Sequence, residues 1–314
     1  MTATIERPRR HHEFGADPRR RRGDRAFGGL ATGAGILILV TLAAVAAFLF
    51  REALPALTGD TDEPFVEYVG PLVFGTIWAA FLALLLATPL AVAVALFTSH
   101  YAPRRLAAPL GYFIDLLAAV PSVVYGLWGF GVLAPVLARS VYPWLEDHLG
   151  FIPLFKGPAA ASGRTLMTVA VVLAVMILPI ITAISREVFL QTPRLHEEAS
   201  LALGATRWEM IRQAVIPYGR SGIISGAMLG LGRALGETMA VALIISPADL
   251  ITFNVISPQN PNTIAANIAL TFPESSGIEV NRLIATGLVL FLLTFAVNVL
   301  ARRIARAGFS GAAG

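Results

Sequence analysis

The feature that most constrains this chain is a series of long apolar stretches separated by shorter polar segments. An α-helix needs roughly 20 mainly apolar residues to cross the hydrocarbon core of a bilayer. Stretches of that length lie at about 27–50, 70–98, 110–138, 166–189, 220–246 and 283–301. The whole sequence is 56% hydrophobic and only 14% charged, which is too apolar for a single soluble core. The sequence therefore predicts an all-α integral membrane protein with six transmembrane helices.

The second and third stretches are longer than a straight crossing requires. They contain Pro89, Pro121 and Pro135. Proline removes a backbone donor and crowds the preceding helical turn. We expect these two helices to be tilted or broken.

The basic residues follow the loops between alternate stretches. Of the 24 Lys and Arg residues, 18 lie in residues 1–26, 99–109 and 186–220 and at the C-terminal end. Because Lys and Arg concentrate on the cytoplasmic side of membrane proteins, both termini are predicted to be cytoplasmic. A basic chain can also bind nucleic acid, but charge placed between apolar stretches favours membrane orientation, so the expected surroundings are a lipid bilayer and no nucleic acid.

The sequence contains few residues that could support cofactor chemistry or catalysis. It has no Cys, and its five His residues have no partner at helical i, i+4 spacing, so we expect no metal or other cofactor. The string nearest to a phosphate-binding P-loop, residues 157–165, has one residue too many between its glycines and Arg in place of Lys. The chain is therefore not expected to be an enzyme, and ATP hydrolysis would belong to a partner.

The fifth apolar stretch contains two charges, Arg233 and Glu237, within the string GRALGETMAV. Arg233 lies about 11 residues, or roughly 17 Å, beyond a helix start near Gly222, which is close to the middle of a core about 30 Å thick. Glu237 follows four residues later, so the two side chains would share a helix face and could pair. The structural alternative is a self-neutralised pair, although two leucines would fill that role without the desolvation cost. Since intramembrane charges usually face a pathway, and Arg suits an oxyanion, we predict that both residues line a substrate pathway.

The polar segment at 192–217 predicts a helix–turn–helix between spans four and five. Thr192 and Pro193 are typical of a helix start, and Gly204 can end that helix near Leu203. Thr206 and Glu209 have the spacing of a capping box for a second short helix, which would end at Pro217. A DNA-binding role does not suit a segment held between two spans, and a plain connecting loop would not need these caps. We interpret it as a docking element for a soluble partner.

This segment resembles the EAA motif of prokaryotic ABC importer permeases. The motif positions are Glu198, Ala199 and Gly204, followed by Pro217. The sequence departs from the family pattern at three conservative positions, which are Ser200, Ala214 and Ile216. The resemblance implies that the loop inserts into a cleft on a cytoplasmic ATPase.

Three further strings narrow the resemblance. Residues 75–97, 118–133 and 231–244 are similar to the PstC-type permeases of phosphate-specific importers, and the similarity covers roughly 70–302. It implies transport of inorganic phosphate, with Arg233 and Glu237 matching charged positions linked to phosphate passage. It also implies a PstA-type second permease, a dimer of a PstB-type ATPase and an external PstS-type phosphate-binding protein. A permease for another oxyanion, such as sulfate or molybdate, and an ion-coupled carrier are the alternatives.

The expected organisation has four parts. A disordered basic cytoplasmic tail covers 1–26, and the first span with an external loop covers 27–69. The ABC importer permease domain would cover 70–304, and a C-terminal tail 305–314.

Overall fold

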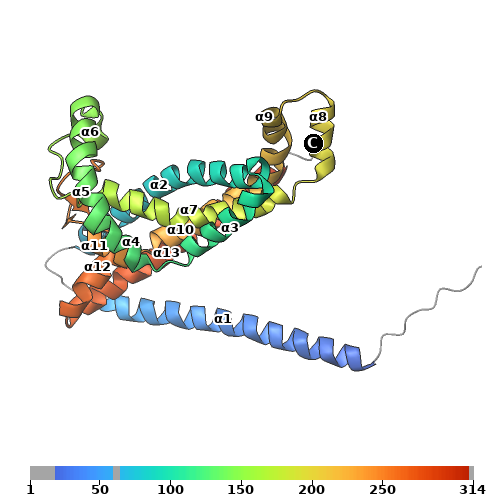
Figure 1. Cartoon of the computed structure of the whole chain (residues 1–314). Helices are drawn as coiled ribbons and strands as arrows, with labels where there is room; N and C mark the ends of the chain where they lie inside the picture. The colour runs from blue at the N-terminus through green and yellow to red at the C-terminus, as the bar shows by residue number, and fades with distance from the viewer. Residues whose placement is uncertain (1–17, 59–63, 311–314) are drawn as a thin grey trace, which may run out of the picture. The chain divides into compact units, whose positions relative to one another are not determined.

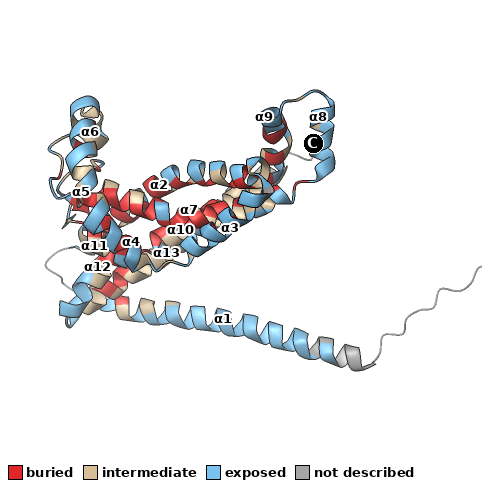
Figure 2. Ribbon diagram, viewed as in Figure 1, coloured by how far each residue is buried: buried red, intermediate tan, exposed pale blue. Residues whose placement is uncertain are grey.

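A computed structural model describes residues 18–58 and 64–310 of the chain, and most of these residues are helical (Figure 1). Contacts divide the chain into one unit that ends at Arg51 and a second that begins at Glu52. Helix α1 (Pro18–Thr58) supplies the described part of the first unit, and its side chains from 26 to 45 are exposed on every face (Figure 2). A helix that is apolar all round suits lipid rather than water. The tail predicted at 1–26 is helical from Pro18 onward, and residues 1–17 lie outside the described part.

The prediction of an all-α membrane fold is confirmed. Within the described residues, five helical stretches are long and apolar enough to cross a membrane, at Ala26–Thr58, Phe65–Tyr101, Ser122–Leu149, Leu166–Leu190 and Ile278–Arg303. The stretch expected at 220–246 is divided into two shorter helices, α10 (Ile216–Leu235) and α11 (Met239–Ile244). A sixth crossing and the predicted domain boundaries therefore stay predictions.

Three helices form the centre of the second unit. Helices α2 (Phe65–Leu96) and α7 (Leu166–Leu190) pack against each other, and both pack against α10 (Figure 1). The buried face of α2 is a row of alanines at helical spacing, Ala80, Ala83, Ala87, Ala91 and Ala95. The face of α10 that meets α7 is a row of glycines, Gly219, Gly222, Gly226 and Gly230. Small residues let helix backbones approach closely, so the sequence builds this centre from backbone proximity rather than from large side chains.

Prolines account for the wide π-helical turns of the chain. Each π turn within the described residues ends two residues before a proline: η1 (Phe97–Tyr101), η2 (Gly129–Leu133), η3 (Leu137–Val141) and η5 (Ile211–Val215). The residue just before the proline donates its N–H to the carbonyl five residues earlier, as Ile216 does to Ile211. A proline has no N–H and crowds the carbonyl four residues before it, and the wider turn removes that conflict.

Helices continue through three of the prolines at which we expected a tilt, a break or a helix end. One continues through Pro135 from α4 (Ser122–Trp128) to α5 (Ala134–Val136) and α6 (Tyr142–Leu149). Another continues through Pro217 into α10, so the predicted helix end at that residue is wrong. Helix α2 is likewise unbroken at Pro89.

The break expected in the third stretch occurs at Pro121. Helix α3 (Arg104–Ala118) ends just before this proline and α4 begins at Ser122, so the stretch 110–138 is not one continuous helix. The residue before a proline is disfavoured in the helical region, which explains the stop. The Tyr125 hydroxyl donates to the Leu117 carbonyl oxygen at 2.8 Å and so bridges the break.

Two peripheral regions lie at opposite ends of the long helices (Figure 1). One contains α8 (Arg194–Ala202) and α9 (Arg207–Met210). The other contains α6 and several further short elements. These are η4 (Pro153–Phe155), β1 (Pro247–Ala248), β2 (Asn260–Pro261), α12 (Ile264–Thr271) and η6 (Phe272–Glu274). Buried Asn260 joins these loops to the core, because its Oδ1 accepts the Leu166 N–H at 2.9 Å. The last helix, α13 (Ile278–Ser310), extends into the predicted C-terminal tail, whose residues 311–314 lie outside the described part.

Candidate functional site

The two charges of the fifth apolar stretch lie at a break between helices. Helix α10 ends at Leu235, Gly236 leaves the helix, and α11 begins at Met239. Arg233 therefore lies in the last turn of α10, whereas Glu237 lies in the connection. The prediction that both side chains share one helix face is wrong, because the helix ends between them.

Glu237 acts as a cap for α11. Its side chain is 8% exposed, and its Oε1 accepts the backbone N–H of Ala240 at 3.1 Å. The first N–H groups of a helix have no partner inside the helix, so this bond satisfies a donor that would otherwise be buried and unpaired. No ion pair joins Glu237 to Arg233, both of which are described residues. The expected pairing is therefore absent, and the carboxylate holds the start of α11 instead.

Arg233 is half-buried and makes no hydrogen bond or ion pair with any described residue. It lies within electrostatic range of Tyr125 on α4. Its position in the last turn of α10 is favourable for a cation, because the free carbonyl groups there carry partial negative charge. The guanidinium thus keeps its five donors available to a ligand.

Several glycines of α10 that precede Arg233 pack against α7. Gly222 and Gly226 face α7: a Cβ at Gly222 would lie 2.5 Å from a Val188 methyl carbon, and one at Gly226 would lie 3.3 Å from the Ile181 carbonyl oxygen. Leu229, one turn before Arg233, is 58% exposed. The glycines therefore allow close packing of α10 on α7, and α10 is exposed at Leu229, one turn before Arg233.

The far end of α11 is held by a residue that the sequence did not single out. Arg164 donates through Nε to the Ile244 carbonyl oxygen at 3.2 Å and through a terminal nitrogen to that of Ile245 at 3.0 Å. Helix α11 also packs closely on α4, because a Cβ at Gly126 would lie 2.8 Å from the Cα of Ala240. The short helix is thus fixed at both ends and along one side. An isolated Arg in a loop gave no sequence signal for this contact.

The predicted docking loop forms a second candidate site. Gly204 separates α8 from α9 with φ of +88°, the left-handed conformation expected of a helix-ending glycine. The capping box is confirmed: Thr206 Oγ1 accepts the Glu209 N–H at 3.3 Å, and a Glu209 carboxylate oxygen accepts the Thr206 N–H at 2.8 Å. The Thr206 N–H and, second, the Thr206 hydroxyl, which donates to the same carboxylate oxygen at 2.7 Å, lower the pKa of the Glu209 carboxyl below its ordinary value. Thr192, which we expected at the start of this helix, does not cap it, because α8 begins after Pro193 without a side-chain cap.

The loop presents its motif residues and several large apolar side chains on the surface. Glu198 and Ala199 are exposed, and the exposed apolar residues include Leu195, Leu203 and Trp208. Leu203 is 90% exposed, which is unusual for a leucine in an ordered turn. Large apolar side chains exposed in this way suit an interaction surface.

The remaining candidates for chemistry have structural roles. The loop nearest to a P-loop leads into α7, and its Thr165 hydroxyl oxygen accepts the Thr168 N–H at 3.3 Å as a helix cap. Among the described residues, no group of three His, Cys, Asp or Glu side chains is arranged to hold a metal ion.

Solved structures show which class of protein has this fold. The chain matches a structure of the MetNI methionine ABC transporter with a TM-score of 0.57 at 16% identity, covering 79% of this chain and 99% of that one. It matches a bacterial ABC transporter that imports the acidic polysaccharide alginate with a TM-score of 0.57 at 15% identity, covering 92% and 99%. The fold is that of the membrane permeases of ABC transporters.

Sequence comparison gives the family. Residues 87–307 match the family described as "Binding-protein-dependent transport system inner membrane component". The chain is 46% identical to the phosphate transport system permease protein PstC 2 of Mycobacterium tuberculosis, covering 93% of this chain and 94% of that one. It is 41% identical to the phosphate transport system permease protein PstC of Mesorhizobium japonicum, covering 89% of each. The chain belongs to this family of inner-membrane transport components.

Proposed function

We propose that this chain is the permease subunit of an ATP-driven importer that moves inorganic phosphate across the cytoplasmic membrane. Relatives named as phosphate transport permeases match nearly the whole chain at 40–46% identity, which supports the substrate. The structural observation that carries the proposal is the unpaired guanidinium of Arg233 at the break between α10 and α11. Broken helices are common at the substrate sites of transporters.

The chemistry of Arg233 suits a tetrahedral oxyanion. A planar guanidinium can donate two parallel charge-assisted hydrogen bonds to two phosphate oxygens. Because Glu237 caps α11, the incoming anion does not have to displace a carboxylate from Arg233. In this proposal Arg233 contacts or steers the anion, and Glu237 keeps α11 and the break in place.

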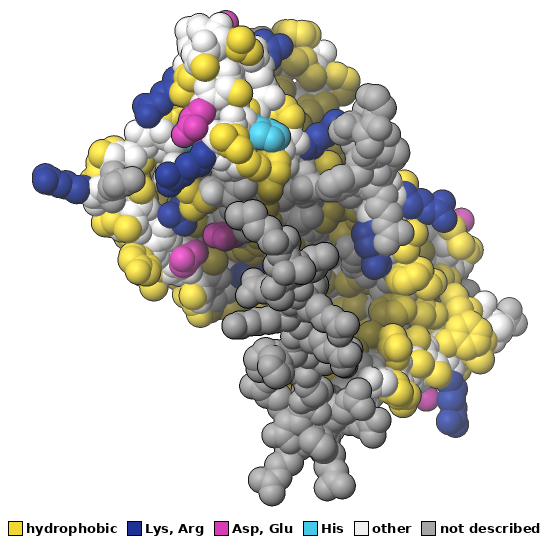
Figure 3. Space-filling model, turned by 90° about the vertical axis from the view of Figure 1, so that its right-hand side faces the viewer, with side chains coloured by type: hydrophobic (Ala, Val, Ile, Leu, Met, Phe, Trp, Pro, Cys, Tyr) yellow, Lys and Arg dark blue, Asp and Glu magenta, His cyan; other side chains and the backbone are white. Residues whose placement is uncertain are grey.

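In the proposed assembly, the α8–α9 loop is the docking surface for the ATPase. The α8–α9 loop docks on a dimer of a PstB-type ATPase through Glu198, Ala199 and the turn at Gly204. Pro217 lies at the start of α10, where movement of the loop would enter the helix that carries Arg233. Figure 3, seen from the side of α8 and α9, shows Lys and Arg side chains spread over the visible face, which supports a cytoplasmic location for this end. A PstA-type permease would complete the pathway, and an external PstS-type protein would deliver phosphate to the opposite end.

Purification and transport together test this proposal. The chain is expressed with its neighbouring permease and ATPase subunits, purified through a tag on this chain, and reconstituted in vesicles with the binding protein. We expect the ATPase to co-elute and labelled phosphate to enter the vesicles only with ATP. Unlabelled phosphate should abolish uptake of the label, whereas sulfate and molybdate should not.

Two results would overturn parts of the proposal. Failure of unlabelled phosphate to compete, with competition by sulfate or molybdate, would assign another oxyanion. Uptake driven by an ion gradient without any ATPase would assign an ion-coupled carrier and contradict the role of the α8–α9 loop.

A further inference from the structure

The end of α2 contacts the α8–α9 loop through two consecutive residues of η1. His100 Nε2 lies 3.5 Å from Glu197 Oε1 on α8, and both side chains are largely shielded, at 10% and 24% exposed. The next residue, Tyr101, lies beneath Arg207 of α9, whose guanidinium carbon is 5.8 Å from the ring centroid. The π turn therefore contacts both helices of the loop.

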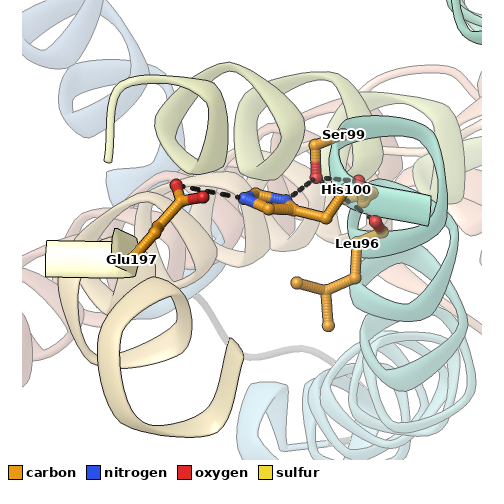
Figure 4. Close-up of polar contacts among 5 residues, drawn as sticks. Leu96, Ser99, His100 and Glu197 are labelled. Carbon is orange, nitrogen blue, oxygen red and sulfur yellow. Dashed lines mark hydrogen bonds and ion pairs between the residues drawn. The ribbon is translucent and has the colours of Figure 1, made fainter. Parts of the chain in front are cut away.

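The imidazole of His100 is also held through its Nδ1 atom, on the side away from Glu197. Its Nδ1 lies 2.7 Å from the Ser99 hydroxyl oxygen, and that hydroxyl donates to the Ala95 carbonyl oxygen at 2.7 Å (Figure 4). The ring is thus fixed by the last backbone turn of α2, and its Nε2 edge points to Glu197 (Figure 4). Below it, an apolar cluster of Ala95, Leu96, Phe189, Met210, Ile211 and Val215 joins α2 to α7 and η5.

The two adjacent glutamates of α8 have different environments. Glu197 is partly buried against His100, whereas Glu198 is exposed. Consecutive residues on a helix point about 100° apart, so one carboxylate can face the body of the protein while the other faces a partner. The motif residue Glu198 stays available for docking because Glu197 makes the internal contact.

The covalent path of the chain explains why this contact matters. Helix α8 is connected by the backbone to α7, and α9 continues through η5 into α10. Helix α2 has no such connection to the loop, so a movement of α8 reaches α2 only through noncovalent contacts, either directly or through the packing of α2 on α7 and α10. We propose that His100 and Glu197 form a latch that makes α8 and α2 move as one body when the ATPase acts on the loop. This inference rests on the proposed function, because the force comes from the partner ATPase.

The latch is a positioning contact rather than a source of stability. A single partly exposed contact of this kind contributes little to folding, so its loss should leave the protein folded. Its effect should appear instead in the relative movement of α8 and α2.

The absence of Cys allows a direct measurement of that movement. Leu90→Cys on α2 and Leu195→Cys on α8 place spin labels at side chains that are 57% and 76% exposed. Distances between the labels are measured in the purified complex in lipid nanodiscs, without nucleotide and with ATP trapped by vanadate. In the otherwise unchanged chain we expect the same distance distribution in both states. With His100→Ala or Glu197→Ala we expect the distribution to shift or broaden on trapping.

Exchanging the two residues of the contact tests whether the contact itself, rather than a general disturbance of the structure, determines the distances. The double variant His100→Glu with Glu197→His can remake the contact with its partners exchanged, so it should restore the unchanged distribution. Glu187→Ala, which removes an exposed carboxylate near the end of α7, should behave as the parent chain does. Elution of each variant with the ATPase reports that it is folded.

The proposal is overturned if the labels on the parent chain move apart on trapping, or if both single variants behave as the parent does. The distance measurement needs no phosphate. A complex that hydrolyses ATP but does not transport phosphate would therefore contradict the proposed substrate without contradicting the latch. If no ATPase binds to the complex, both the proposed function and the latch are contradicted.

Discussion

The capping role of Glu237 leads to a quantitative prediction about α11. Glu237→Ala removes the acceptor for the Ala240 N–H, at a residue that is only 1% exposed. Leaving a buried donor without a partner costs about 1–3 kcal/mol. At about 2 kcal/mol, the population of the locally open form of α11 rises roughly 30-fold. Glu237→Gln keeps an oxygen at the same position, so its cost should stay below about 1 kcal/mol, or roughly fivefold.

Hydrogen–deuterium exchange measures this opening directly. Peptides covering residues 236–246 should exchange roughly 30-fold faster in Glu237→Ala and close to the parent rate in Glu237→Gln. Peptides from the middle of α7 provide the internal reference. Equal acceleration in both variants would refute the cap and would favour a role that depends on the negative charge, such as pairing with Arg233.

Other predictions concern packing, the turn and pH. Gly222→Val should lower the free energy of unfolding of the purified protein by about 1–3 kcal/mol, because the added side chain overpacks against α7. Gly232→Ala should leave the free energy of unfolding unchanged, because no neighbour lies within 4 Å of the added carbon. Gly204→Ala should cost about 1–2 kcal/mol at φ of +88° and weaken co-elution with the ATPase, and the less strained Gly204→Asn should retain more of it. Because the folded pKa of Glu209 is lowered, its cap should stabilise α9 above the ordinary glutamate pKa and lose that effect as pH falls through the lowered value. An NMR titration of the Glu209 side chain should show the lowered pKa, and Thr206→Val should raise it.

The sequence predicted the elements that depend on local chemistry. The membrane class follows from the length of the apolar stretches, and the turn at Gly204 with the Thr206–Glu209 box follows from residue types at fixed spacing. Each of these features is determined by residues that are close together in the sequence. The same applies to the break at Pro121, where the backbone restriction acts on the adjacent residue.

The errors come from features that depend on the rest of the fold. Pro217 was expected to end a helix, but a π turn before it lets the helix continue. The periodicity of 220–246 predicted one helix, whereas the chain breaks at Gly236, where the Glu237 side chain starts a new helix instead of pairing with Arg233. The contact of His100 with Glu197 joins residues 97 positions apart, and that of Arg164 with α11 joins residues at least 80 positions apart. No pattern in the sequence indicates either contact.

The central claim is that Arg233 handles the transported anion. It is tested most directly by ATP-driven phosphate uptake in vesicles containing the complete complex with Arg233→Leu. Arg220→Leu is the matched control, because it makes the same change at an exposed position of the same helix. We predict that Arg233→Leu reduces uptake to background while the ATPase still co-elutes, and that Arg220→Leu retains uptake. Uptake by Arg233→Leu equal to that of the control would contradict the account.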